Sequence, residues 1–156
     1  MIKKLETVLN HANQHCANNG VQLTEKRKTV LTGLLASEKA LSAYELADYC
    51  REHLATDMPP MSVYRILSFL ESQQLVHKLS LANKYIACSH ITCDHGHDHV
   101  QFLICNQCQD VKETRMEPHT LHSIEKKITE AGFHLASPQL EINAVCDACF
   151  KKTNAS

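Results

Sequence analysis

The stretch PPMSVYRILSFLESQQLVHKLSLANKYIAC, residues 59–88, decides the fold of this chain. Its two leading prolines interrupt the chain, and the run that follows repeats apolar residues at helical spacing: Val63, Ile66, Leu67 and Leu70. The segments LVHKLS and NKYIAC then alternate apolar and polar residues, which predicts a β-hairpin. A helix followed at once by a hairpin is typical of a winged helix-turn-helix, provided that further helices precede it.

Those helices are indicated upstream. Residues 3–17 place apolar side chains at helical spacing, and a second helix is expected after Thr24, with Val30, Leu31, Leu34 and Leu35 on its buried face. The third helix has the clearest start, because Ser42 and Glu45 in SAYE form a capping box. We therefore expect a winged-helix DNA-binding domain over residues 1–84.

The pattern changes beyond residue 84. VQFLIC and VKETR are strand-like on either side of NQCQD, a helix is expected from Pro118 to a stop at Gly132, and FHLASPQLEINAVC returns to extended chain. Residues 85–156 are thus predicted to form a small α/β domain. The fold class expected for the whole chain is α+β, a winged helix-turn-helix followed by this smaller domain.

Composition restricts the compartment and the partners. The sequence starts with a polar amphipathic run, and neither a signal peptide nor a membrane span is visible, so no membrane partner is expected. Eight cysteines without an export signal indicate reduced thiols and a cytoplasmic protein. Residues 1–84 hold ten Lys and Arg against eight Asp and Glu, whereas residues 85–156 hold six against nine, which suggests different partners for the two halves.

Two Cys-x-x-Cys pairs predict a metal site. Each two-residue gap lets both thiolates face one ion, and two pairs complete a closed tetrahedral shell that suits structural zinc. Neither pair has thioredoxin-like flanks, which disfavours a redox role. The four expected ligands are Cys105, Cys108, Cys146 and Cys149.

A second group of ligand residues is left over. The segment 88–108 holds four cysteines and four histidines, and three of the histidines, His95, His97 and His99, alternate with Gly and Asp. A solvated histidine-rich loop is one interpretation of that alternation. If the hairpin packs beside the second domain, however, His77, Cys88 and Glu113 would converge with a loop histidine. One sulfur, two nitrogens and one oxygen favour zinc over iron or manganese.

An enzyme is disfavoured. Zinc deaminases need His-x-Glu with Pro-Cys-x-x-Cys, but no His-x-Glu occurs in the chain, and Ile104 and Val145 precede its two pairs. No His-Glu-x-x-His segment occurs either. Zinc storage or delivery by the histidine-rich loop is a separate alternative.

Taken together, VQLTEKR, SAYELADYCRE, PPMSVYRILSFLESQQLVHKL and the paired cysteines resemble the ferric uptake regulator family of metal-sensing repressors, and within it the zinc-responsive branch. The resemblance implies a homodimer that binds an operator in double-stranded DNA, represses zinc uptake genes and carries two zinc ions per chain. It assigns the four paired cysteines to a structural zinc, and His77, Cys88, Glu113 and either His97 or His99 to a regulatory zinc. An iron-, manganese- or peroxide-sensing member would share this fold.

The chain departs from the family pattern at two places: Glu25 stands where a proline is usual, and Cys93 has no counterpart. The role of Cys93 and of His95 is therefore left open. The helix that starts near Ser62 is expected in the major groove, with Arg65 bridging O6 and N7 of a guanine. Tyr44 or Tyr64 would contact a thymine methyl or a phosphate, or be partly buried instead. The remaining expected DNA contacts are Ser62, Ser68, Arg27, Lys28, Lys78 and Lys84.

Overall fold

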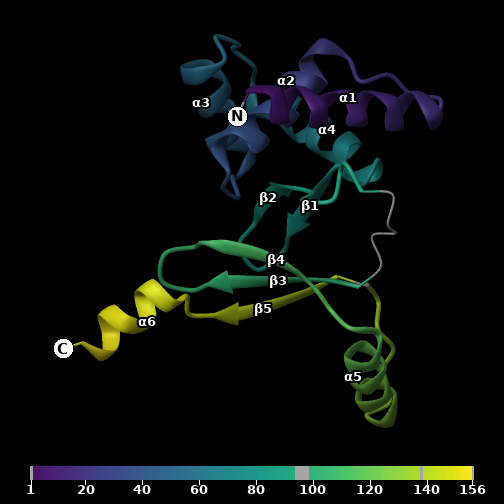
Figure 1. The fold of residues 1–156 in the computed structure, drawn as a ribbon, viewed down its shortest axis with the longest axis vertical. Coiled ribbons are helices and arrows are strands. Elements are labelled where there is room, and N and C mark those ends of the chain that lie inside the picture. The colour runs from purple at the N-terminus through teal and green to yellow at the C-terminus, as the bar shows by residue number, and fades with distance from the viewer. Residues whose placement is uncertain (1, 94–98, 138, 156) are drawn as a thin grey trace. The chain divides into compact units, whose positions relative to one another are not determined.

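The computed structural model describes residues 2–93, 99–137 and 139–155, which form two compact units, Met1–His95 and Gly96–Ser156 (Figure 1). Helices dominate the first unit, and a small sheet with two helices makes up the second, so the predicted α+β class is confirmed. The domain boundary expected at 84/85 falls inside a strand of the first unit.

The first unit has the helices and the hairpin expected from sequence. Its elements are α1 (Ile2–Asn18), α2 (Glu25–Ser37), α3 (Ala43–His53), α4 (Pro60–Ser72), β1 (Val76–Leu79) and β2 (Lys84–Ala87). Thr24 caps α2, since its side-chain oxygen accepts the Arg27 N–H at 3.4 Å. Pro60 occupies the first turn of α4, where its missing N–H is not needed by the helix.

The core of this unit lies where α2, α3 and α4 pack together. Val30, Leu31, Val63 and Leu67 are fully buried there, together with the apolar side chains that line the other helices. Gly33 permits the close approach of α2 and α3, because a Cβ at this position would lie 2.9 Å from Cδ1 of Leu46. Gly33 thus completes the buried face of α2, where the sequence pattern had placed Leu35, which is only partly buried.

The hairpin is attached to the start of α3. β1 and β2 pair antiparallel, with Val76 opposite Ala87 and Leu79 opposite Lys84. The backbones of Leu41 and Tyr85 exchange two hydrogen bonds, of 2.9 and 2.8 Å, so the residue before the N-cap of α3 pairs with β2. Nζ of Lys84 also lies 3.3 Å from Oε1 of Glu45 in the first turn of α3.

The capping box at the start of α3 gives a first testable expectation. The Ser42 hydroxyl accepts the Glu45 N–H at 3.1 Å, and the Glu45 carboxylate accepts the Ser42 N–H at 2.8 Å. This second bond, helped by Lys84, lowers the pKa of Glu45, so the carboxylate is charged and bonded near neutral pH. We expect Ser42→Ala to lower the free energy of unfolding by about 1 kcal/mol in urea denaturation at pH 7. Ser68→Ala, at an exposed position inside α4, is the control and should cause no loss; equal losses would contradict a capping effect.

The second unit is a three-stranded sheet, with a helix at either end (Figure 1). Its elements are β3 (Val100–Cys105), β4 (Val111–Arg115), α5 (Pro118–Glu130), β5 (Leu140–Ala144) and α6 (Asp147–Asn154). The strand order is β4-β3-β5, with β4 antiparallel and β5 parallel to β3. The start of α5 at Pro118 and the left-handed Gly132 that follows it were expected, whereas α6 was not. Among the described residues, no helix is both long and apolar enough to cross a membrane.

Candidate metal centres and nucleic-acid interface

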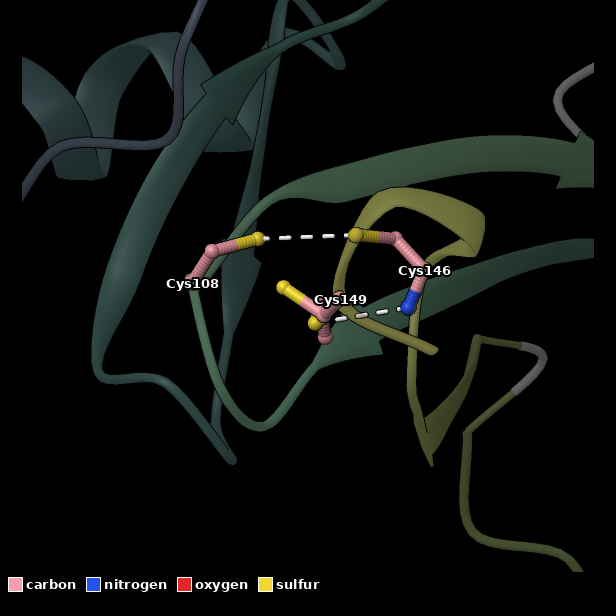
Figure 2. Close-up of side chains that lie close together, drawn as sticks. Cys108, Cys146 and Cys149 are labelled. Atoms are coloured by element: carbon pink, nitrogen blue, oxygen red, sulfur yellow. Dashed lines mark hydrogen bonds between the residues drawn. The ribbon is translucent and has the colours of Figure 1, made fainter. Parts of the chain in front are cut away.

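Four cysteines converge at one edge of the sheet in the second unit. Cys105 ends β3 and is in register with Ala144 at the end of β5. Because β3 and β5 are parallel, the turn after each strand emerges at the same edge, and these turns bring in Cys108 and Cys146. Cys149 comes from the first turn of α6. The sulfurs of Cys108, Cys146 and Cys149 point toward one another in Figure 2, and all four sulfurs lie within 4.8 Å of one another.

The spacing of these sulfurs fits a zinc ion. Four sulfurs held about 2.3 Å from a central zinc stand about 3.8 Å apart in a tetrahedron. The sulfurs of Cys108 and Cys146 are 3.7 Å apart, and all four cysteines are free thiols (Figure 2). The donor set is therefore chemically and geometrically suited to a closed structural zinc site.

The protein environment makes one of these thiols acidic before any metal is bound. Backbone N–H groups of Cys108, Cys146 and Gln107 point at the Cys105 sulfur, and they lower its pKa to about 6. The Cys146 N–H donates to that sulfur over 3.4 Å. Hydrogen bonding with the Cys146 side chain and, to a smaller extent, burial raise the pKa of Cys149 to about 12. Cys105 thus offers a thiolate at neutral pH, and a metal must displace the proton of Cys149.

A second pair of possible ligands lies on the hairpin of the first unit. His77 is opposite Ile86, and the ladder continues to Cys88, whose N–H donates to the Leu75 carbonyl at 2.9 Å. Side chains alternate along a strand, so Cys88, two residues past Ile86, shares a face with His77. A ring nitrogen of His77 and the Cys88 sulfur lie within 4.8 Å of each other. The Cys88 side chain is buried, and its sulfur accepts the His90 N–H at 3.4 Å.

The other residues of the expected regulatory set belong to the second unit. Glu113 lies on β4 opposite Phe102 and is partly buried. His99 immediately precedes β3 with a left-handed backbone (φ 70°), and its carbonyl accepts the Met116 N–H at 2.9 Å. Its Nδ1 is buried and has no hydrogen-bond partner among the described residues. The alternatives His95 and His97 fall outside the described residues, while Cys93 is exposed.

The exposed face of α4 carries the residues expected to read DNA. Arg65 and Ser68 are exposed on it, whereas Ser62 is only partly exposed. Tyr44, on α3, is 63% exposed and stands edge-on to Tyr64, with ring centroids 6.3 Å apart. Tyr64 itself packs partly against the core, which agrees with the partial burial considered from sequence.

Arg27 has a structural role in addition to the DNA contact expected of it. Its guanidinium carbon lies 3.6 Å above the centre of the Phe69 ring, and Nη1 donates to the Gln22 carbonyl at 2.7 Å. The side chain therefore links α2 to α4. Sequence reasoning missed this role because Phe69 lies 42 positions further along the chain.

Sequence reasoning also missed Met61, which is 64% exposed in the first turn of α4. The signal was present in the chain, since residues 61, 65 and 68 follow helical spacing. The helix was expected to start near Ser62, which left Met61 out.

Comparisons with known proteins cover both units. The model of the ferric uptake regulator family matches residues 18–143. The chain is 36% identical over 146 residues to the zinc uptake regulation protein of Escherichia coli (strain K12), an alignment that covers 92% of this chain and 82% of that protein. A solved zinc uptake regulator complexed with zinc and DNA is 31% identical, with a TM-score of 0.80 over 97% of this chain and 98% of that one. The crystal structure of holo XcZur, also 31% identical, gives a TM-score of 0.73 over 91% and 96%.

Proposed function

The chain belongs to the ferric uptake regulator family, and from this premise we propose that it is a zinc-responsive, DNA-binding repressor of zinc uptake genes. One observation carries the choice of metal: the thiol of Cys88 lies against His77 on the hairpin, separate from the four-cysteine cluster. A thiolate beside an imidazole suits zinc better than iron or manganese. The similarity to a zinc uptake regulator complexed with zinc and DNA supports the same choice.

We propose two zinc ions per chain, one for each ligand set. Cys105, Cys108, Cys146 and Cys149 would hold a structural ion that secures α6 to the sheet. The regulatory ion would take Cys88 and His77 from the first unit, and Glu113 and a histidine from the second. Of His97 and His99 we choose His99, because its buried Nδ1 has no partner among the described residues and a buried polar atom requires one.

We propose that the protein forms a homodimer. The second unit exposes several large apolar side chains that a second copy could cover, namely Phe133, Ile142, Val145 and Phe150. A dimer also explains how a small winged helix gains specificity, because two recognition helices read two half-sites about 34–36 Å apart. In each half-site, Arg65 would contact a guanine, with Tyr44, Tyr64, Ser62, Ser68 and Arg27 as further DNA contacts.

Zinc would then change the fraction of the protein whose two units adopt the arrangement that binds DNA. Ligands drawn from both units would be brought together only in that arrangement, so the protein would bind zinc more tightly there. A shift from about 1:99 to 99:1 needs a preference of about 10⁴-fold, or roughly 5.5 kcal/mol. Two or three additional metal–ligand bonds would have to supply this difference.

The alternative functions differ from this proposal in the metal that they require or in the number of ions bound per chain. A member that senses iron, manganese or peroxide would not need Cys88, and a storage protein would bind several weak ions without preferring an operator. Family membership places the chain among transcription regulators, and we propose no enzymatic role. The reduced thiols that both sites need are consistent with action in the cytoplasm.

The decisive experiment measures DNA binding as a function of buffered free metal. Purified protein is titrated against a fluorescent promoter fragment of a zinc-transporter gene from the source genome, at fixed salt, with zinc, iron(II) or manganese(II). A scrambled duplex is the control. We expect tight, specific binding with zinc alone. Binding driven by iron or manganese would reassign the metal, and metal-independent binding would contradict a sensor.

A further inference from the structure

Met61 is an apolar side chain placed where a recognition helix meets base edges. It lies in the first turn of α4 and is 64% exposed, although α4 buries Val63, Leu67 and Leu70 on its other face. Arg65 follows it by four residues, so both side chains lie on the same exposed face. In helix-turn-helix proteins, the N-terminal residues of the recognition helix are the ones that contact bases.

Met61 also continues an apolar surface that begins on α3. Tyr64 follows Met61 by three residues and is therefore its neighbour on the helix. Tyr44 stands edge-on to Tyr64, with ring centroids 6.3 Å apart at an angle of 83°. Met61, Tyr64 and Tyr44 thus form a row of largely apolar side chains beside Arg65.

The chemistry of methionine limits what it can recognise. Its thioether has no hydrogen to donate and is a weak acceptor, so it cannot read the hydrogen-bonding pattern of a base pair. The one apolar group that base pairs present in the major groove is the 5-methyl of thymine. A flexible, polarizable thioether packs well against such a methyl group.

We propose that Met61 determines operator specificity by packing against a thymine methyl. This inference rests on the proposed function. Four residues separate Met61 from Arg65, about 6 Å along α4, which is comparable to about two base-pair steps of about 3.4 Å each. The thymine therefore lies within about two base pairs of the guanine that Arg65 reads.

Replacing thymine by uracil removes that methyl group and leaves the pairing edge intact. Each thymine of the operator fragment is changed to uracil in turn, at symmetric positions in both half-sites, and binding of the zinc-loaded protein is measured by anisotropy. We expect one position near the guanine to weaken binding about fourfold for each half-site, equivalent to about 0.8 kcal/mol for a buried methyl group.

The Met61→Ala variant completes the test. It should bind the thymine operator about as weakly as the wild type binds the uracil operator, and it should no longer distinguish the two. Met61→Leu should keep most of the discrimination. Ile2→Ala, at an even more exposed apolar position on α1, is the matched control and should behave like the wild type. Thermal unfolding of each variant verifies that its fold is intact.

Results that contradict the role of Met61 can be distinguished from results that contradict the proposed function. Thymine discrimination that survives in Met61→Ala but disappears in Tyr44→Ala would assign the methyl contact to Tyr44 and overturn the proposal. Zinc-dependent binding with no sensitive thymine would overturn the role of Met61 and leave the proposed function intact. If the wild type shows no zinc-dependent binding to any duplex, the proposed function fails, and this inference fails with it.

Discussion

Replacing Cys108 by serine is expected to unfold much of the second unit and to release one zinc ion per chain. The substitution removes one of four thiolates whose sulfurs lie within 4.8 Å of one another. In small zinc domains, metal binding supplies about 10–16 kcal/mol of folding free energy. A loss of at least about 3 kcal/mol would lower the Tm of so small a unit by roughly 12–24 °C.

The matched control is Cys93→Ser. Both Cys93 and Cys108 are exposed cysteines, but only Cys108 belongs to the cluster. We expect Cys93→Ser to retain wild-type zinc content by elemental analysis and wild-type Tm by calorimetry. Sedimentation should show that Cys108→Ser also loses the dimer, since α6 and β5 would no longer be held together. Full zinc content and unchanged Tm in Cys108→Ser would refute the structural site.

Replacing Cys88 by serine should instead separate folding from regulation. Serine retains nearly the same volume but removes the thiolate, so the structural zinc and the Tm of the second unit should be preserved. If about 1% of the protein occupies the DNA-binding arrangement without regulatory zinc, apparent operator affinity at saturating zinc falls about 100-fold. Anisotropy measures this loss, and elemental analysis should give one zinc per chain in place of two.

His77→Ala should reproduce the effect of Cys88→Ser, because both side chains share one face of the hairpin. His90→Ala is the control: His90 follows closely in the chain, and its backbone N–H, which donates to the Cys88 sulfur, is retained by the substitution. Undiminished zinc-dependent binding in Cys88→Ser would remove this thiol from the sensor. Binding of Cys88→Ser that requires iron or manganese would point to a different member of the family.

Local signals in the sequence were sufficient for most of the first unit. The capping box of Ser42 and Glu45, the proline pair before α4 and the alternation in the hairpin each specify an element through neighbours only a few residues apart. The same locality explains the four cysteines, because two-residue gaps shape each half of the site and both halves follow strands of one sheet.

Features that depend on distant residues were harder to predict. α6 was missed because its eight residues follow directly on a cysteine turn and contain no long apolar repeat. Val100–Cys105 and Leu140–Ala144 were each recognised as extended, but their parallel pairing depends on a crossover through β4 and α5. The histidine of the regulatory set could not be chosen from spacing alone, since His97 and His99 fit equally well.

The paired backbones of Leu41 and Tyr85 have a mechanical consequence. They join the hairpin, which carries His77 and Cys88, to the start of α3, which carries Tyr44. Two of the proposed metal ligands, His77 and Cys88, and the proposed DNA-contacting surface therefore belong to one compact unit, in which these hydrogen bonds join them. Such a unit would transmit a signal by moving as a whole, so zinc would leave the affinity of a single winged-helix unit for DNA unchanged. Zinc would instead control whether the two winged-helix units of the dimer can bind the same duplex at once.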